Sequence, residues 1–510
     1  MFKQNEWVRF EFRDQTERSG RVNFLSFTTS THCWSFNTLL ELHTLCRNLF
    51  FYSNTFYSNT LLGMNFLARW LCNLAYFLAI SLMLPWMLWR HLAGKKKRSG
   101  WHERLLGPKI DLRDTQDSTL DARAILWIHA VSVGEVNLLG TFVPAIRQAY
   151  PQYRIAISAS TDSGLELASG RFKDCITFRF PIDFSWAINR VLRQLRPVAL
   201  VLTELEVWPN TLSLLREKNI PVAVINGRLS DTSFRNYQRL GMIGRSLFSK
   251  LQLVVAQSEE YTDRFTQLGV PNGLVHLAGS IKFDAVRTQR NNAQTVALQM
   301  LVGIKQDDIV WLAGSTSEPE ESVVIATFCE LRSQLPALRL IIVPRHPERF
   351  KLVDKLLQQA GVHYIRRSQV STLASPWARN QSSEFRPDWE VLLVDTIGEL
   401  SHWWGAADIG YVGGSLGNRG GQSMIEPAGF GVATSFGPNT KNFRDIVGLL
   451  LASEAAVVVH DGKEMAEFVH KCYRDAGYRE ALGCNAQQLA IQQQGATGAT
   501  ILALKAILER

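Results

Sequence analysis

Two short stretches place carboxylates where an expected strand gives way to a helix. Residues 129–137 read HAVSVGEVN and follow an apolar run, 124–128, so Glu135 lies in the first turn of the next helix. The helix dipole alone favours an acid there. Its alternative role is a general base that points into a binding cleft. The stretch leaves both interpretations open.

The second stretch, TELEVWPN (203–210), follows another apolar run and carries Glu204 and Glu206. Strand side chains alternate, so both carboxylates would face the same side if the strand persists. Pro209 suits the first turn of a following helix. One acid could be a structural cap, but a cap does not explain both. A later strand end, GSIKFD (279–284), offers Lys282 as a surface residue or as a contact to a phosphate or oxyanion.

Three motifs in the second half could hold a phosphate. Arg345 in VPRHPERF (343–350) follows a strand, and a guanidinium suits bidentate phosphate binding. The glycines of GGS (413–415) and NRGGQSMIEP (418–427) would let backbone amides approach a phosphate at a helix start. Glu426 follows about one turn later and could accept ribose hydroxyls.

The sequence around these motifs alternates between apolar segments, typical of strands, and amphipathic segments, typical of helices. That alternation is typical of parallel sheets with helices on both faces, and it predicts two doubly wound, Rossmann-like domains that face a cleft. The joint is the polar stretch 287–295. The expected strands are 124–131, 153–160, 176–181, 198–203, 222–226, 251–257 and 275–279, then 309–314, 338–343, 362–366, 390–395, 408–412, 431–436 and 455–459.

Composition narrows the function classes. The chain has 510 residues, 46% of them hydrophobic, and a formal net charge of +9. This charge fits an anionic membrane or a phosphorylated substrate, and without an RRM or zinc-finger signature we expect no nucleic acid. The seven cysteines form no C-x-x-C pair, which indicates free thiols in a reducing compartment and no zinc site. The first strand lacks the G-x-G-x-x-G that a dinucleotide-binding dehydrogenase would carry there.

The chain before the first domain divides into two parts. Residues 1–63 repeat YSNT without a persistent period and are interpreted as a poorly ordered extension or a misplaced start. Residues 64–92 are largely apolar and precede a basic cluster, so we expect a membrane-anchor helix. It would either span the membrane or lie in the interface. The positive-inside rule then places the later domains in the cytoplasm.

Together and in this order, the motifs resemble the 3-deoxy-D-manno-octulosonic acid (Kdo) transferases of lipopolysaccharide biosynthesis. The likeness covers roughly residues 64–480. It implies a metal-independent, inverting GT-B glycosyltransferase without a cofactor, in agreement with the lack of any D-x-D triplet. The motifs are SVGE, ELEVWPN, NGRLS (226–230), GSIKFD, VPRHPERF, DTIGEL (395–400), GGS and FGPNTKNF (436–443).

The resemblance also implies substrates and residue roles. The donor would be CMP-Kdo, the acceptor a lipid A precursor (lipid IVA), and the place the inner membrane. Glu135 would be the general base, and Glu204 and Lys282 would stabilise the transition state. An N-terminal domain (93–286) would bind the acceptor and a C-terminal domain (287–480) the donor, followed by terminal helices (481–510). The residues expected to contact CMP are Pro344, Arg345, Ile397, Gly398, Glu399, Ser423, Met424, Ile425 and Glu426.

One motif departs from the family pattern. Many members read GGHNPLE where residues 420–426 read GGQSMIE, so contacts through the missing histidine and asparagine are in doubt. Two other functions compete: a nucleotide-sugar epimerase of the same fold, and an anchored nucleotide-sugar-binding protein without activity. A membrane anchor argues against the epimerase, and Glu135, Glu204 and Lys282 argue against a mere binding protein.

Overall fold

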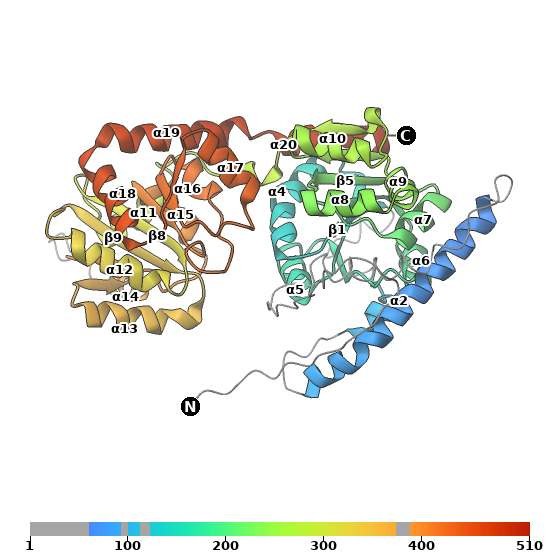
Figure 1. Cartoon of the computed structure of the whole chain (residues 1–510), viewed down its shortest axis with the longest axis horizontal. Coiled ribbons are helices and arrows are strands. Elements are labelled where there is room, and N and C mark those ends of the chain that lie inside the picture. The colour runs from blue at the N-terminus through green and yellow to red at the C-terminus, as the bar shows by residue number, and fades with distance from the viewer. Residues whose placement is uncertain (1–60, 93–99, 113–122, 374–387, 510) are drawn as a thin grey trace, which may run out of the picture. The chain divides into compact units, whose positions relative to one another are not determined.

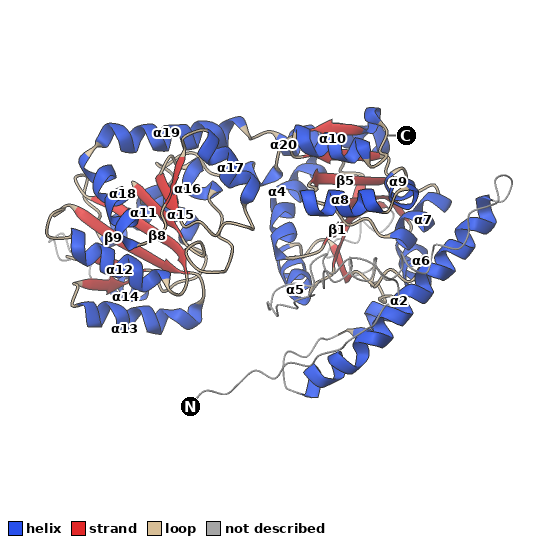
Figure 2. Ribbon diagram, in the orientation of Figure 1, coloured by secondary structure: helices blue, strands red, loops and turns tan. Residues whose placement is uncertain are grey.

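The computed structural model describes residues 61–92, 100–112, 123–373 and 388–509. The predicted extension, 1–63, lies outside them except for its last three residues, and so does most of the basic cluster at 93–99. The described chain contains two parallel sheets of seven strands each. Helices lie on both faces of these sheets (Figure 2). The two-sheet α/β prediction is therefore confirmed.

The first sheet has the strand order β3-β2-β1-β4-β5-β6-β7. Its strands are β1 (Ala124–Ala130), β2 (Tyr153–Ala159), β3 (Ile176–Arg179), β4 (Pro197–Thr203), β5 (Val222–Gly227), β6 (Leu253–Ala256) and β7 (Val275–Leu277). The helices before and within this half are α2 (Leu61–Leu92), α3 (Trp101–Leu106), α4 (Val133–Ala149), α5 (Asp162–Arg171), α6 (Ser185–Leu195), α7 (Pro209–Glu217), α8 (Asp231–Arg239), α9 (Met242–Phe248), α10 (Glu259–Gln267), η2 (Asn272–Leu274) and η3 (Ile281–Phe283).

The second sheet has the order β10-β11-β9-β8-β12-β13-β14. Its strands are β8 (Ile309–Thr316), β9 (Leu338–Pro344), β10 (Tyr364–Arg366), β11 (Val391–Leu393), β12 (Ile409–Val412), β13 (Ala433–Phe436) and β14 (Ala456–Val458). Its helices are α11 (Ala293–Val302), α12 (Glu320–Leu331), η4 (Pro347–Arg349), α13 (Phe350–Ala360), α14 (Arg367–Leu373), α15 (Leu400–Ala406), α16 (Ile425–Gly429), α17 (Arg444–Ala452), α18 (Gly462–Arg474), α19 (Ala476–Gln492) and α20 (Ala496–Leu508).

All fourteen predicted strands form, with ends that differ from the prediction by a few residues. Apolar runs identified them because the central strands of a parallel sheet are covered on both faces. In β1, six of the seven residues are buried, and Trp127 and Ile128 have no exposed surface. Burial of each such side chain stabilises the fold by roughly 1.5–3 kcal/mol.

The last two helices pack against different sheets. α19 contacts α16, α18 and β13 in the second half, whereas α20 contacts α4 and strands β4 to β6 in the first. Leu504 and Ile507 of α20 belong to the same buried core as β1 and α4. The C-terminus thus ends among elements of the first half, as the red helix beside the green ones shows (Figure 1).

α2 includes the predicted anchor and begins three residues before it, at Leu61. In the described part of the chain, no helix combines the length and the apolar character required to cross a bilayer. The prediction of a spanning helix is therefore not supported. One face of α2 packs on the first half: Asn73 Nδ2 donates to Ser185 Oγ at 2.8 Å, and Tyr76 Oη donates to Asp183 Oδ2 at 3.2 Å.

Candidate active site

The carboxylates of SVGE and ELEVWPN lie at the ends of two central strands of the first sheet. β1 and β4 are neighbours there, and the chain leaves β1 toward β2 on one side and enters β4 on the other. This reversal separates the two loops that follow these strands, and ligands of doubly wound sheets bind at such a point. Glu135 follows β1, while Glu204 and Glu206 follow β4.

Glu135 turns back from the first turn of α4 toward the end of β1. Its Oε2 accepts from Val131 N at 2.8 Å and lies 2.7 Å from Thr203 Oγ1. Its Oε1 accepts from Ser132 Oγ at 3.4 Å. The side chain therefore fixes both strand ends, which is more than a helix-start acid requires.

Burial, together with the negative charge of Glu204, raises the pKa of the Glu135 carboxyl to about 7. The hydrogen bonds from Thr203, Val131 and Ser132 favour the charged form and act in the opposite direction. A carboxyl with a pKa near neutrality is suited to accept a proton in a reaction and to release it afterwards.

Glu204 lies in a strained turn directly after β4. Its φ of 58° is in the left-handed region, which costs a non-glycine residue about 1–2 kcal/mol. This turn ends the strand, so the predicted alternation that would put Glu204 and Glu206 on one side does not continue. The turn brings Glu204 Oε1 to 2.9 Å from Lys282 Nζ. Two of the three predicted catalytic residues therefore form an ion pair.

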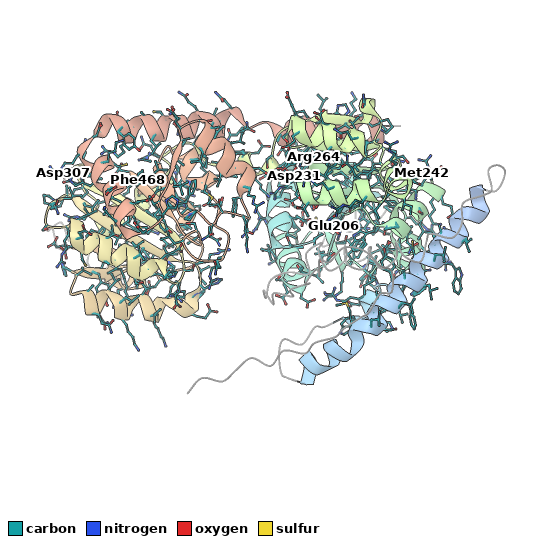
Figure 3. The ribbon with its side chains drawn as sticks, viewed as in Figure 1. Glu206, Asp231, Met242, Arg264, Asp307 and Phe468 are labelled. Carbon is teal, nitrogen blue, oxygen red and sulfur yellow. The ribbon has the colours of Figure 1, made fainter. Side chains whose placement is uncertain are left out.

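Glu206 lies in the first half of the protein (Figure 3). Its Oε2 accepts from Trp208 Nε1 at 2.8 Å. Burial raises the pKa of Glu206 to about 8, and the charges of Glu135 and Glu204 add to this effect. Glu206 is thus a largely neutral acid at pH 7 beside the other two carboxyls.

The loop that carries Lys282 is held from two sides. Asn226, at the end of β5, accepts through Oδ1 from Ile281 N at 3.0 Å. Asp284 Oδ1 accepts from Gly495 N at 2.6 Å and thereby connects the loop to the start of α20. The crossing of the C-terminal chain to the first half consequently fixes the turn beside Lys282.

Sequence reasoning missed two residues of this site, Thr203 and Asn226. Thr203 begins the motif TELEVWPN, and a hydroxyl at a strand end is a signal for hydrogen bonding. Asn226 adopts a φ of 52°, and asparagine tolerates this region better than most residues. Within the described ranges, no three His, Cys, Asp or Glu side chains are grouped as a metal site.

In the second half, one carboxylate organises the loops around the end of β12. Glu320, at the start of α12, has no exposed surface. Its Oε1 accepts from Ser415 N at 2.8 Å and from Leu416 N at 3.0 Å, and its Oε2 accepts from Gly414 N at 2.7 Å. Tyr411 Oη also donates to Oε1, at 2.8 Å.

These bonds change the interpretation of the GGS motif. We expected its backbone amides to approach a phosphate, but the amides of Gly414 and Ser415 already donate to Glu320. Gly413 N donates to Gly314 O at 2.9 Å. The motif therefore shapes a loop inside the protein, and its amides are not free to hold a phosphate.

The predicted CMP contacts come from three loops of the second half. Pro344 ends β9, and the exposed Arg345 follows it, with its amide bonded to Thr316 O at 2.9 Å. Burial raises the pKa of Glu426, and the positive charge of Arg345 opposes this effect. The structure therefore brings Arg345 and Glu426 close enough to interact.

The predicted contacts at 397–399 differ in the exposure and the hydrogen bonds of their side chains. Ile397 is 79% exposed, and Gly398 adopts a φ of 90°. Glu399 already accepts from Arg367 Nη2 at 2.9 Å and from Thr396 Oγ1 at 2.8 Å. The loop 397–399 therefore presents an apolar side chain and a glycine turn, with its carboxylate bound within the protein.

Residues 423–425 precede and begin α16. Met424 and Ile425 are buried side chains of the core, with 0% and 3% exposure, whereas Ser423 is half-buried. Met424 and Ile425 therefore present almost no surface to a ligand in this structure. The roles of all nine predicted CMP contacts remain predictions.

Known proteins resemble this chain over most of its length. Residues 99–285 match the family model for 3-deoxy-D-manno-octulosonic-acid transferase (kdotransferase). A 3-deoxy-D-manno-octulosonic acid transferase of Haemophilus influenzae is 31% identical over 387 residues, which are 76% of this chain and 87% of that protein. One of Bordetella pertussis is 30% identical over 440 residues, 84% of this chain and 98% of that protein.

The solved structures show a likeness of fold. The UDP-GlcNAc 2-epimerase of Neisseria meningitidis, bound to UDP-GlcNAc, aligns with a TM-score of 0.51 at 14% identity. The alignment covers 75% of this chain and all of that one. At this identity only the architecture is shared.

The buried hydrogen bonds of Glu320 predict a large effect on stability. We expect Glu320→Gln to lower the free energy of unfolding by roughly 3 kcal/mol or more, because an amide nitrogen would face amides that need an acceptor. Urea unfolding followed by fluorescence measures this change. Glu330→Gln, on the exposed side of the same helix, is the matched control and should change stability by less than about 0.5 kcal/mol. Equal effects of the two variants would contradict the interpretation.

Proposed function

The chain belongs to the 3-deoxy-D-manno-octulosonic acid transferase family, and we propose that it transfers Kdo from CMP-Kdo to a lipid A precursor in lipopolysaccharide biosynthesis. Two relatives of about 30% identity support this, since each is matched over most of its length. The observation that carries the mechanism is the carboxyl of Glu135, whose pKa burial raises to about 7, beside the Glu204–Lys282 ion pair.

The proposed step is an inverting displacement. The acceptor hydroxyl oxygen forms a bond to the anomeric carbon of Kdo on the side opposite the leaving group. The bond from that carbon to the phosphate oxygen breaks, and its electron pair leaves with CMP. The hydroxyl proton passes to Glu135 as the oxygen attacks. General-base catalysis of this kind contributes typically 10²–10⁴-fold to a rate.

Glu204 and Lys282 would act on the charges that develop in this step. The sugar becomes oxocarbenium-like, and a carboxylate such as Glu204 stabilises positive charge. The leaving phosphate gains negative charge, which the ammonium of Lys282 stabilises. The two groups are 2.9 Å apart before substrate binds. Each is therefore held by the other, so little reorganisation is needed when the reaction charges appear.

The second half would hold the donor, as the family resemblance implies. Arg345 would contact the phosphate of CMP, and Glu426 the ribose hydroxyls. The turn at Gly398 and the polar Ser423 would complete the contacts. Positively charged side chains, and not a divalent metal ion, would neutralise the phosphate. The reaction would therefore proceed without a metal.

We further propose that α2 binds the cytoplasmic face of the inner membrane, as a helix that lies in the interface. Asn73 and Tyr76 bind the first half, and Arg69 pairs with Glu217. The other face exposes large apolar side chains at a helical spacing. These are Leu67, Trp70, Leu71, Leu74, Phe77, Leu78 and Leu82. Such a stripe suits burial at the boundary between headgroups and acyl chains.

Two other functions have less support. The shared fold fits an epimerase, but the likeness to that enzyme is limited to 14% identity. An inactive binding protein would not need a carboxyl of raised pKa next to a preformed ion pair. Transfer therefore accounts for more of the site than either alternative.

Glu135→Gln tests the general base. We expect the variant to fold and to bind CMP, but to turn over at least about 100-fold more slowly, because the amide cannot accept the proton. Product is measured by mass spectrometry with CMP-Kdo, lipid IVA, detergent and EDTA. The matched control is Glu166→Gln on the exposed side of α5, which should retain full activity. An active Glu135→Gln enzyme would exclude Glu135 as the base, and wild-type transfer only with added metal would contradict the metal-free mechanism.

The raised pKa of Glu135 predicts the dependence of activity on pH. A base acts in its charged form, so kcat/KM should be constant above the pKa, about 7, and fall as the pH drops through it. Below that pH the fall should approach tenfold per pH unit. Initial rates between pH 5 and 9, in detergent and at constant ionic strength, measure this profile. An acidic limb near pH 4.3, as for an exposed glutamate, would disagree with this assignment.

The apolar face of α2 predicts membrane binding. Phe77 and Leu82 are 62% and 69% exposed. Changing both to Glu should lower binding to phosphatidylglycerol-containing vesicles at least tenfold, because two apolar side chains are lost and two negative charges are added. Flotation of the full-length protein measures it. The control Met300→Glu changes a side chain of similar exposure on α11 and should bind as wild type. Unchanged flotation of the α2 variant would argue against this surface.

A further inference from the structure

Thr203 lies between the proposed base and the backbone of β1. Its Oγ1 is 2.7 Å from Glu135 Oε2 and 2.9 Å from the carbonyl oxygen of His129. Thr203 itself has no exposed surface. Water therefore does not compete for its hydroxyl. Both contacts are hydrogen bonds among Thr203, Glu135 and the carbonyl of His129 alone.

A count of protons separates two arrangements. A threonine hydroxyl has one proton, and a carbonyl oxygen has none. If Glu135 is protonated, its Oε2–H donates to Thr203 Oγ1, and the Thr203 hydroxyl donates to His129 O. If Glu135 is charged, the Thr203 hydroxyl turns and donates to Oε2, beside the amide of Val131. Both arrangements use the same atomic positions and differ only in the rotation of one O–H bond.

We propose that Thr203 is a positioning residue for Glu135, and that its hydroxyl holds the carboxyl in one place by turning between the two acceptors as the proton arrives and leaves. This inference rests on the proposed role of Glu135 as the general base. The carboxyl then keeps the same position in both protonation states, since neither state requires the side chain to move.

The groups that face Glu135 make such a partner necessary. The negative charge of Glu204, in the loop after β4, disfavours the charged form of Glu135. Glu206 in the same loop is largely neutral at pH 7, because burial raises its pKa to about 8. Lys282 is paired with Glu204. His129 of β1 contributes no charge at neutral pH, because burial lowers its pKa to about 3. The hydrogen bonds from Thr203, Val131 and Ser132 thus act against both desolvation and the charge of Glu204.

Infrared titration tests the inference without measuring transfer. The C=O stretch of the protonated Glu135 carboxyl is identified as the band that Glu135→Gln removes, and its midpoint is followed with pH. Thr203→Val keeps the size of the side chain but loses the donor, so the midpoint should rise by roughly one pH unit. Thr203→Ser retains the hydroxyl and should restore the wild-type midpoint. Thr203→Ala provides a second hydroxyl-free variant should valine not fold.

Thr434→Val in β13 is the matched control. Thr434 is 2% exposed, and its hydroxyl donates to Val432 O at 2.8 Å. It should lose comparable stability and leave the midpoint unchanged. An unchanged midpoint in the hydroxyl-free Thr203 variants, or an equal rise in Thr203→Ser, would overturn the inference. Activity of Glu135→Gln would instead remove the proposed base, and the titration would still decide whether Thr203 controls this carboxyl.

Discussion

A carboxylate taken out of water must be supplied with hydrogen-bond donors, and the loops of both halves are arranged to meet this requirement. In the second half, Glu320 is fully buried and receives the amides of Gly414, Ser415 and Leu416. A network with this many donors to one charged group tolerates few alternative loop conformations. The ends of β8 and β12 are thereby fixed relative to each other, next to the loops expected to hold the nucleotide.

In the first half, the buried carboxylate of Glu135 has fewer hydrogen-bond donors than Glu320 has. Glu135 receives two amide or hydroxyl donors at 2.7–2.8 Å and a weaker one at 3.4 Å, while the negative charge of Glu204 opposes its ionisation. Its charged form is therefore less favoured than that of a fully supplied carboxylate. The two buried acids therefore differ: the hydrogen bonds of Glu320 fix the surrounding loops, whereas the pKa of Glu135, about 7, suits this carboxyl to exchange a proton.

Support for the site also comes from distant parts of the chain. Asp284 binds the start of α20, and α20 packs into the core of the first half. The loop of Lys282 is therefore stabilised by residues more than 200 positions later in sequence. On the opposite side, Asp183 Oδ2 accepts from Tyr76 of α2 and, at 2.8 Å, from Asn210 N, directly after the turn that carries Glu204 and Glu206. Asn73 of α2 also accepts from Asn210 Nδ2 at 3.1 Å. A membrane-bound α2 would thus be joined, directly and through a buried carboxyl, to the start of α7 that follows this turn.

The sequence by itself determined the strands and the family. Runs such as 124–128 identify buried parallel strands because both faces of such a sheet exclude water, and SVGE, ELEVWPN and GSIKFD carry enough chemistry to select Glu135, Glu204 and Lys282. Only the tertiary structure decided how these groups meet. The left-handed turn at Glu204 brings it into an ion pair with Lys282. Glu320 accepts hydrogen bonds from the amides of the glycine motif that was predicted to bind a phosphate. Local patterns report burial and chain reversal, whereas the pKa of a carboxyl or the partner of an amide depends on atoms brought together from distant segments.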